Sequence, residues 1–335
     1  MFGRTSGPRV ERGAGLFLFH PLPRLGLNAG FALPPKNVTR YTGAVLEYGL
    51  RLSRMQRSVF LSLQLFAQSL RKRTVQPTTI EEIVMTMAVE STEWDTPEER
   101  VSRQTLLKEL GEKGREAIAK AHFLVIGAGG LGSPAILYLA AAGAGHITVV
   151  DNDTVSISNL SRQLLHTTDR VGVNKALSAK ETVASHTPFC EITSVTEMVD
   201  EARLVALMTH VDVVLDCSDN LATRVAAGRA AVVAKKPLVF GSAIRFNGQV
   251  TVFDGRNPDA PTFDDLFEED AAQNDVKASR VGVFSGVTGV VGTLQASEAL
   301  KLAANIGEPL IGRLLMVDTL NMTFETIRYG KRVAW

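Results

Sequence analysis

His122-Phe-Leu-Val-Ile-Gly-Ala-Gly-Gly-Leu-Gly132 is the stretch that decides the fold. Its apolar residues 123–126 predict a buried strand, and Gly127, Gly129 and Gly132 match the pattern G-x-G-x-x-G. In this pattern the first glycine permits a tight turn, the second lets the backbone approach a phosphate, and the third lets the next helix pack closely. The stretch therefore predicts a strand, a phosphate-binding loop and a helix.

The residues that follow complete one strand–helix–strand unit. A helix is expected over residues 133–142, ended by Gly143 and Gly145, and a second strand over residues 146–150. Asp151 comes at the carboxyl end of that strand, where a carboxylate can hydrogen-bond a ribose hydroxyl. The unit predicts a bound nucleotide, and taken alone it favours an enzyme that uses NAD or FAD.

Five further motifs change that expectation. They are Arg100-Val-Ser-Arg103-Gln104, Ser158-Asn159-Leu160-Ser161-Arg162-Gln163, Gly172-Val-Asn-Lys175, Asp216-Cys-Ser-Asp219-Asn220-Leu-Ala-Thr-Arg224 and Gly248-Gln249. Arg162 and Lys175 offer cations to the phosphates of ATP, which backbone N–H groups at a glycine loop also bind. Asp219 lies just past an expected strand, and Mg²⁺ prefers one or two carboxylates together with phosphate oxygens and water. A hydride-transfer site needs none of this, so the motifs favour ATP and Mg²⁺.

The order of expected elements predicts an α/β fold. Its core is a Rossmann-like, mostly parallel sheet with helices on both faces, continued by antiparallel strands. The remaining expected strands are 192–199, 211–215, 237–242, 248–253, 314–317 and 323–329, and the remaining expected helices are 97–120, 171–185, 202–210, 223–234 and 286–304. Leu106, Leu107 and Leu110 are expected on one face of the helix over residues 97–120, and residues 254–280 are expected to hold a mobile crossover loop.

In their order and spacing the motifs resemble the MoeB/ThiF/HesA family, the ubiquitin-activating-type adenylyltransferases. The resemblance runs from about Arg100 to the C-terminus. It implies that the C-terminal carboxylate of a ubiquitin-like sulfur carrier ending in Gly-Gly attacks the α-phosphate of ATP, giving an acyl-adenylate and pyrophosphate. It also implies a homodimer and a role in molybdopterin, thiamine or related sulfur-transfer biosynthesis.

The resemblance assigns roles residue by residue. The implied nucleotide-binding set is Gly127, Gly129, Gly130, Gly132, Asp151, Ser158, Asn159, Arg162, Lys175, Asp219 and Asn220, and the implied catalytic set is Arg103, Arg162, Lys175 and Asp219. Asn159 and Arg162 would contact phosphates, and Lys175 would neutralise charge on the α-phosphate. Asp219 would bind Mg²⁺. Arg103 would reach across the dimer interface into the partner's site.

Structural roles compete with some of these assignments. Arg162 and Lys175 have the alternative of being solvated surface cations. The family pattern has an aromatic residue where Val101 stands, which weakens the assignment of Arg103 beside it. Asp216 can be structural or catalytic, while Thr223 and the residue after it are expected to cap and start the next helix.

Two departures from the family concern cysteine, since the chain has only Cys190 and Cys217. Many members bind a structural zinc ion through two Cys-x-x-Cys pairs. Two cysteines cannot supply the four thiolates of such a site within one subunit, so no structural zinc is expected. Apolar packing of Phe263, Leu266 and Phe267 is expected to hold that lobe instead.

Several members also carry a nucleophilic cysteine on the crossover loop, where residues 274–281 have none. Cys190 and Cys217 are expected to be buried, so adenylation without an enzyme thioester is expected. Two cysteines without a signal peptide indicate a reducing compartment.

Charge divides the chain near residue 84. Residues 1–80 hold twelve of the 36 Lys and Arg residues but only two of the 35 acidic residues. This division predicts a basic N-terminal extension over residues 1–84, and the resemblance implies a ThiF-type adenylation domain over residues 85–335. The extension is interpreted as a transit peptide, as a disordered or partner-binding segment, or as an over-long start before Met85 or Met87.

Composition narrows the function classes. Residues 81–335 are mildly acidic, so no nucleic-acid partner is expected. The apolar residues 59–70 predict a short amphipathic helix but are too few to cross a bilayer, so a cytoplasmic protein is expected, or an organellar one if the extension is a transit peptide.

Three other functions stay open: adenylation of a peptide or tRNA-base carboxylate, a nucleotide-binding pseudo-enzyme, and hydride transfer.

Overall fold

The computed structural model describes residues 95–267 and 281–332. The expected N-terminal extension, the amphipathic helix over residues 59–70 and much of the expected crossover loop lie outside the described residues. All structural statements below concern the two described ranges.

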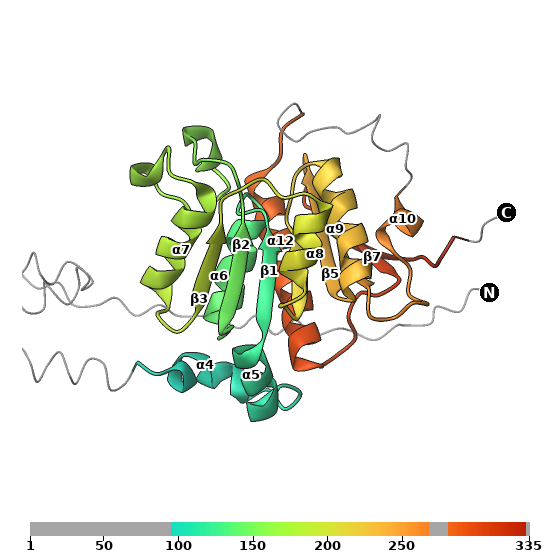
Figure 1. Ribbon diagram of the computed structural model, residues 1–335, viewed down its shortest axis with the longest axis horizontal. Helices are drawn as coiled ribbons and strands as arrows, with labels where there is room; N and C mark the ends of the chain where they lie inside the picture. Colours follow the sequence, from blue (N-terminus) through green and yellow to red (C-terminus); the bar gives the residue numbers. More distant parts are fainter. Residues whose placement is uncertain (1–94, 268–280, 333–335) are drawn as a thin grey trace, which may run out of the picture. The chain divides into compact units, whose positions relative to one another are not determined.

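A single eight-stranded sheet organises this part of the chain, in the spatial order β3-β2-β1-β4-β5-β6-β7-β8 (Figure 1). The strands are β1 His122–Ile126, β2 His146–Val150, β3 Glu191–Val195, β4 Val213–Asp216, β5 Pro237–Ile244, β6 Asn247–Asp254, β7 Arg313–Asp318 and β8 Thr323–Arg328. Strands β3, β2, β1, β4 and β5 run parallel to one another, and β6 to β8 continue the sheet antiparallel. The predicted mostly parallel sheet with an antiparallel continuation is confirmed.

Helices cover both faces of the sheet, as predicted. One face packs against α6 Gly132–Ala141, α7 Lys175–His186 and α12 Ser285–Ala304, and the other against α8 Glu201–Met208, α9 Leu221–Ala234 and the short α10 Phe263–Leu266. Strand β1 shows why the layers form. Phe123 and Val125 point into the first core and Leu124 and Ile126 into the second, so a continuous apolar run is buried on both sides.

The single helix predicted over residues 97–120 is wrong. The segment forms two helices, α4 Pro97–Thr105 and α5 Gly111–Lys120. Helix α4 ends at Thr105, and Gly111, whose φ of +55° lies in the left-handed region, is the first residue of α5. Leu106 and Leu107 lie in the connection and are 75% and 56% exposed, so they form no buried stripe.

The helix expected from Val171 begins four residues later. Gly172 has φ +90°, and Asn174 caps α7 by accepting hydrogen bonds from the N–H groups of Ala176 and Leu177. A 3₁₀ turn, Thr168–Arg170, precedes this break. The strand predicted over residues 192–199 likewise ends earlier, at Val195.

Aromatic packing holds the lobe around α10. The rings of Phe263 and Phe267 are tilted at 36° with centroids 4.7 Å apart, and both rings contact Phe240. Phe253 contacts Phe263 and Tyr329 edge-on. Leu266 packs against the same cluster. The predicted apolar packing of this lobe is confirmed.

Within residues 95–267 and 281–332, no helix combines the length and the apolar composition that crossing a membrane requires.

Candidate active site

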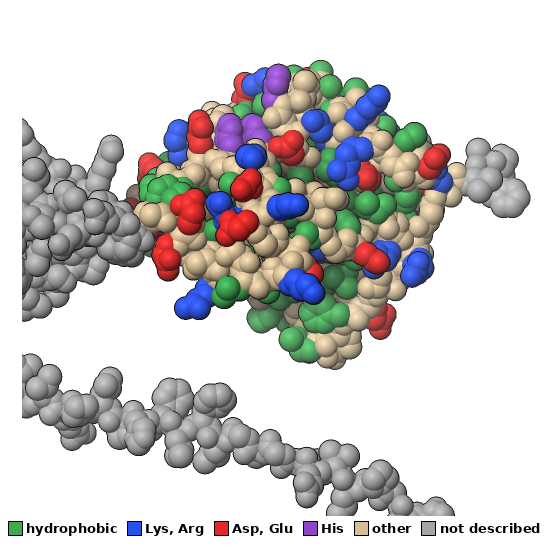
Figure 2. All heavy atoms as spheres, turned by 90° about the horizontal axis from the view of Figure 1, so that it is seen from below, with side chains coloured by type: hydrophobic (Ala, Val, Ile, Leu, Met, Phe, Trp, Pro, Cys, Tyr) green, Lys and Arg blue, Asp and Glu red, His purple; other side chains and the backbone are tan. Residues whose placement is uncertain are grey.

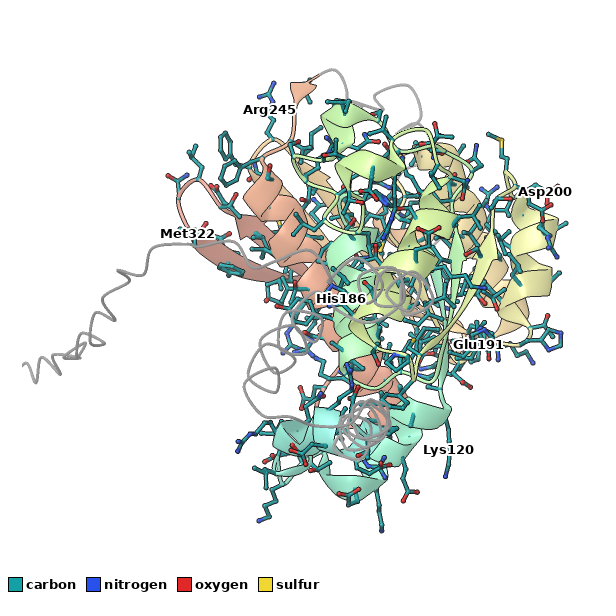
Figure 3. The ribbon with its side chains drawn as sticks, turned by 90° about the vertical axis from the view of Figure 1, so that its left-hand side faces the viewer. Lys120, His186, Glu191, Asp200, Arg245 and Met322 are labelled. Atoms are coloured by element: carbon teal, nitrogen blue, oxygen red, sulfur yellow. The ribbon has the colours of Figure 1, made fainter. Side chains whose placement is uncertain are left out.

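The topology brings the predicted site residues to one edge of the sheet. The glycine loop follows β1, Asp151 follows β2, and the segment Asp216–Asn220 ends β4 and follows it. These three strands are parallel neighbours, so their carboxyl ends meet at the edge where ligands bind in open α/β sheets. Figure 3 shows the two edges: Arg245, just after β5, marks the carboxyl edge, and Lys120, just before β1, marks the amino edge.

The glycine loop has two positions that the fold requires. Gly127 has φ +97°, and a Cβ there would lie 2.8 Å from the carbonyl oxygen of Cys217. A Cβ at Gly132 would lie 1.9 Å from the carbonyl oxygen of Gly127. These two glycines therefore let the loop turn and let α6 approach it.

Gly129 has no such steric requirement, and within the described residues the backbone N–H groups of Gly129 and Gly130 are free for a ligand. A Cβ at Gly129 would meet only the side-chain amide nitrogen of Gln163, at an ordinary 3.5 Å. In the described part of the chain, the backbone N–H groups of Gly129 and Gly130 donate no hydrogen bond. They lie just before the first residue of α6, where free N–H groups and the helix dipole attract an anion.

The Asp151 carboxylate is oriented by backbone donors. Its Oδ2 accepts a hydrogen bond from the N–H of Ala128 at 2.8 Å, and its Oδ1 accepts one from the N–H of Asp153 at 2.9 Å. Burial raises the pKa of Asp151, while Lys175 and the two N–H donors act in the opposite direction. The carboxylate thus ties the end of β2 to the glycine loop and stands at the expected ribose position.

The start of α7 brings Lys175 close to Asp151. Its ammonium group is 2.8 Å from Oδ2 of Asp153, and the lysine side chain is only 9% exposed. Asn174 holds this arrangement by donating hydrogen bonds from Nδ2 to the carbonyl oxygens of Asp151 and Asp153. Asp153 is a site residue that the motifs did not single out, although it stands two positions after Asp151.

Arg162 reaches the glycine loop from the next segment. Its Cγ would lie 3.6 Å from a Cβ on Gly130, and its Nη1 donates a hydrogen bond to the carbonyl oxygen of Ser158 at 3.0 Å. The 3₁₀ turn Ile157–Asn159 positions it. Oδ1 of Asn159 accepts the N–H of Ser156 in a capping box, and the amide nitrogen of Asn159 stays available to a ligand.

The segment after β4 contains one buried and one exposed carboxylate. Asp216 is fully buried, and its Oδ1 accepts hydrogen bonds from the N–H and hydroxyl groups of Ser218. Burial raises its pKa. The structural role considered for Asp216 is therefore favoured, since it shapes the turn that presents Asp219. Asp219 is exposed and makes no hydrogen bond or ion pair with another described residue.

Asn220 takes the capping role that was predicted for Thr223. Its Oδ1 accepts a hydrogen bond from the N–H of Thr223 at 2.9 Å, and α9 begins at Leu221. The sequence assignment of the cap to Thr223 is wrong by three residues. Arg224 follows in the helix and donates to the carbonyl oxygen of Ser218, which ties α9 to the site.

Arg103 is the predicted site residue that the fold does not bring to this edge. It is exposed in the last turn of α4, which lies with α5 at the end of the sheet where β1 begins (Figure 1). Val101 beside it contacts Gly143, at the turn into β2. Arg103 is thus at the amino edge, opposite the glycine loop of its own chain.

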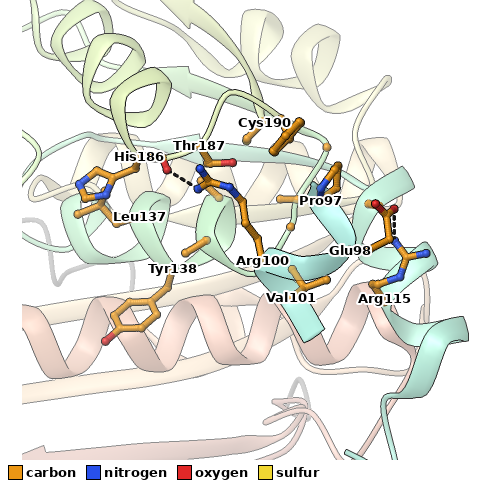
Figure 4. A pocket seen from close by; sticks show the side chains of 17 residues that line it. Pro97, Glu98, Arg100, Val101, Arg115, Leu137, Tyr138, His186, Thr187 and Cys190 are labelled. Carbon is orange, nitrogen blue, oxygen red and sulfur yellow. Dashed lines mark hydrogen bonds and ion pairs between the residues drawn. The ribbon is translucent and has the colours of Figure 1, made fainter. Parts of the chain in front are cut away.

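A hollow of about 760 Å³ lies at this amino edge, between α4, α6 and the turn before β3 (Figure 4). Its cations already have partners. Arg100 pairs with Asp95 and donates to the carbonyl oxygen of His186, and Arg115 pairs with Glu112. Figure 2 views this edge and shows acidic and basic side chains interspersed on it.

Both cysteines are buried, as predicted. Burial raises the pKa of Cys190 to about 12 and that of Cys217 well above its ordinary value. Neither side chain is therefore a thiolate at neutral pH, and neither has the character of a reactive cysteine.

Three buried side chains to which the sequence analysis assigned no role lie beside the loops of the site. His166 donates from Nε2 to the carbonyl oxygen of Ala128 and accepts at Nδ1 from the hydroxyl of Ser178. Burial lowers the pKa of His166, which keeps it neutral. Gln163 is buried near Gly129, and Gln295 of α12 reaches the end of β4. Gln163 and His166 follow Arg162 closely in sequence, but no local signal links Gln295 to the site.

Comparisons with known proteins identify the family of this chain. A sequence profile of the ThiF family matches residues 101–333. The chain is 41% identical over 229 residues to a molybdopterin-synthase adenylyltransferase of Haemophilus influenzae, covering 68% of this chain and 93% of that protein. It is 39% identical over 242 residues to a sulfur carrier protein adenylyltransferase of Thermus thermophilus, covering 70% and 89%, and 40% identical over 246 residues to a SAMP-activating enzyme E1 of Haloferax volcanii, covering 73% and 88%.

Solved structures share the fold. The crystal structure of Escherichia coli MccB with ATP superposes with a TM-score of 0.61 at 18% identity, covering 79% of this chain and 82% of that one.

Proposed function

This chain belongs to the ThiF family and is an adenylyltransferase, and we propose that it transfers AMP from ATP to the C-terminal carboxylate of a ubiquitin-like sulfur carrier. The relatives named as activating sulfur carriers or SAMP proteins support this choice of substrate. The observation that carries the proposal is the group of free N–H donors at Gly129 and Gly130 with the side chain of Arg162 beside them.

These groups fit the phosphates of ATP. Two free N–H groups before a helix bind anionic oxygens, and Arg162 adds a cation next to Gly130. Lys175 supplies a second cation once its ammonium group turns from Asp153 toward the α-phosphate. Asp153 is exposed, so water can solvate its carboxylate when the pair opens. Asp151 is then placed to hydrogen-bond the ribose.

The donor set also fits Mg²⁺. Among the described residues no group of three or more His, Cys, Asp or Glu side chains could enclose a metal, so the protein alone holds no metal cage there. Mg²⁺ suits such a site because it takes one or two carboxylates and completes its shell with phosphate oxygens and water. We assign the protein ligand to Asp219, whose carboxylate has no partner in residues 95–267 and 281–332. When bound, the ion neutralises phosphate charge that builds up as pyrophosphate departs.

The reaction needs positioning and charge stabilisation. A carboxylate oxygen of the carrier attacks the α-phosphorus, and an acyl–phosphate bond forms. The bond from that phosphorus to the oxygen bridging the α- and β-phosphates breaks, and pyrophosphate leaves with the bond electrons. No base is required, because the attacking carboxylate is already ionised. Arg162 and Lys175 stabilise the charge that develops on the phosphates.

Two partners complete the proposal. The carrier would present a flexible Gly-Gly terminus, since a narrow chain end can bring its carboxylate to the α-phosphate. A second copy of this chain would supply Arg103, whose position at the amino edge supports a role in another subunit's site.

The experiment is ATP–pyrophosphate exchange with the full chain, Mg²⁺ and a panel of small β-grasp proteins ending in Gly-Gly. Exchange that depends on one carrier is the expected result, and Asp219→Ala should lower it by about 100-fold or more. Asp259→Ala is the matched control, because Asp259 is also exposed and lies outside the site. Its exchange rate should equal that of the unmodified protein.

Other outcomes would redirect the assignment. Exchange with short peptides or a tRNA-base carboxylate but with no carrier would replace the substrate class. ATP binding without exchange on any carboxylate would indicate a pseudo-enzyme. Equal rates for Asp219→Ala and Asp259→Ala would remove Asp219 from the site.

A further inference from the structure

We propose that Gln295 of α12 is a positioning residue that fixes the segment Asp216–Asn220 and so holds Asp219 where the metal is bound. The inference rests on the proposed function, because it concerns the carboxylate assigned there to Mg²⁺. It adds a residue that lies 76 positions after Asp219 in the chain and outside the five motifs.

Gln295 uses all of its hydrogen-bonding groups at the end of β4. Its Nε2 donates to the carbonyl oxygen of Asp216 at 2.7 Å and to that of Val239 at 3.3 Å. Its Oε1 accepts from the thiol of Cys217 at 3.5 Å. The side chain is fully buried. One amide therefore joins the last residue of β4, the next residue and the neighbouring strand β5.

The space for this amide is made by a glycine. A Cβ at Gly241 would lie 2.2 to 2.5 Å from the three amide atoms of Gln295, so any side chain at position 241 would displace it. An apolar residue at position 295 would avoid the cost of burying an amide. The amide of Gln295, seated against Gly241, instead orients the carbonyl groups of Asp216 and Val239. An apolar side chain could not orient them, because it makes no hydrogen bonds.

The same helix also touches the phosphate loop. A Cβ at Gly292, three residues before Gln295 and on the same side of α12, would lie 2.2 Å from the carbonyl oxygen of Leu131. Thr288 lies one turn earlier, and its methyl group would be 3.1 Å from a Cβ on Gly130. Helix α12 thus contacts both the loop that would bind phosphate and the segment that carries Asp219. Because a helix is rigid over two turns, it sets the distance between them.

Gln295 contacts Asp216 and Cys217, and its action on Asp219 is indirect. The turn from Asp216 to Asp219 is short and is closed by the hydrogen bonds from Ser218 to Asp216. Loss of the bonds from Gln295 leaves the end of β4 free to shift. The Asp219 carboxylate would then spend less time in the position that completes the metal shell.

The test measures Mn²⁺ binding by electron paramagnetic resonance, with the full chain saturated with α,β-methylene ATP. Gln295→Met keeps the length of the side chain and removes its hydrogen bonds. It should weaken Mn²⁺ binding about tenfold, which corresponds to about 1.4 kcal/mol. Binding of the ATP analogue without metal should change less than about twofold, since the glycine loop keeps its donors.

A matched control separates positioning from stability. Thr251→Val removes buried hydrogen bonds to the carbonyl oxygens of Leu310 and Arg313, away from the site. Both variants should lower the melting temperature, and only Gln295→Met should weaken Mn²⁺ binding. Unchanged Mn²⁺ affinity in Gln295→Met, or equal losses in both variants, would overturn the inference.

Two more variants keep the outcome decisive. Asp219→Ala tests the metal ligand itself. Unchanged Mn²⁺ affinity in Asp219→Ala would refute the metal assignment in the proposed function. Weaker Mn²⁺ binding in Asp219→Ala but not in Gln295→Met would refute only the role of Gln295. If Gln295→Met fails to fold, Gln295→Glu replaces it. Its carboxyl group can donate one hydrogen bond when protonated, so its Mn²⁺ affinity, relative to that of the unmodified protein at the same pH, should recover as the pH is lowered toward 6. An affinity that does not recover would count against the inference.

Discussion

The two edges of the parallel sheet differ in which of their polar groups are free to bind a ligand. The amino edge contains a hollow of about 760 Å³, yet its Arg100 and Arg115 side chains are paired with acids. At the carboxyl edge, the N–H groups of Gly129 and Gly130 and the Asp219 carboxylate have no partner within the described ranges. Free N–H groups before a helix attract an anion, so these groups indicate a ligand more directly than volume does.

The largest effect is expected on the free energy of unfolding, in a comparison of two loop glycines. The fold requires Gly132, whereas Gly129 leaves room for a ligand. Gly132→Ala would place a Cβ 1.9 Å from a backbone oxygen, which should cost about 4 kcal/mol or more of the free energy of unfolding. Gly129→Ala meets only an ordinary 3.5 Å contact and should change stability by less than about 0.5 kcal/mol. It should still weaken ATP binding about tenfold by crowding the phosphate.

Urea unfolding and calorimetric titration with an ATP analogue measure the two effects on the same full-length proteins. The comparison fails if Gly129→Ala unfolds the protein as readily as Gly132→Ala does. It also fails if Gly129→Ala binds the analogue as tightly as the unmodified protein.

The next prediction compares one cation from each edge. Lys175→Ala should lower pyrophosphate exchange by about 100- to 1,000-fold, because it removes a charge assigned to the α-phosphate. Arg115→Ala removes a paired cation from the amino edge and should change exchange by less than about twofold. Losses of similar size in both variants would mean that exchange depends no more on Lys175 at the carboxyl edge than on a cation at the amino edge.

The sequence predicts the carboxyl edge well because its signals are local. The apolar strand, the glycine spacing and Asp151 lie within 30 residues, and neighbouring parallel strands bring the segment around Asp219 to the same edge. Each of these elements follows from short-range periodicity and turn chemistry.

Other features depend on contacts that no local pattern records. Leucines at positions 106 and 107 are predicted on one helix face, but α4 ends at Thr105 and they lie exposed in the connection to α5. Gln295 meets Asp216 across 79 positions, because α12 folds back over the sheet. The place of Arg103 at the amino edge likewise depends on how α4 packs. Tertiary packing decides all three, and a single sequence carries no pattern for it.

The smallest expected effect tests a histidine pair at the amino edge. His122 and His146 begin neighbouring strands in register, and their rings stack with centroids 3.7 Å apart. The ring of His122 contacts the carbonyl oxygen of His210 and the hydroxyl of Thr148, with Asp212 and Glu191 nearby. Burial, followed by the charge on His146, lowers the pKa of His122 from its ordinary value of 6.5.

Because its pKa is lowered in the folded state, His122 takes up a proton more readily in the unfolded chain. Stability from the neutral ring is therefore complete above pH 6.5 and declines as the pH falls below that value. The melting temperature should fall between pH 7.5 and 5.5, and His122→Asn should reduce that fall by about 1–3 °C. Burial also lowers the pKa of His166. Because His166 is present in the unmodified protein and in His122→Asn, the difference between their two falls in melting temperature reports on His122. The same fall in both proteins would mean that the stacked pair has no part in the pH dependence. Pyrophosphate exchange at pH 7.5 should be equal in both, since the pair lies at the edge opposite the candidate site.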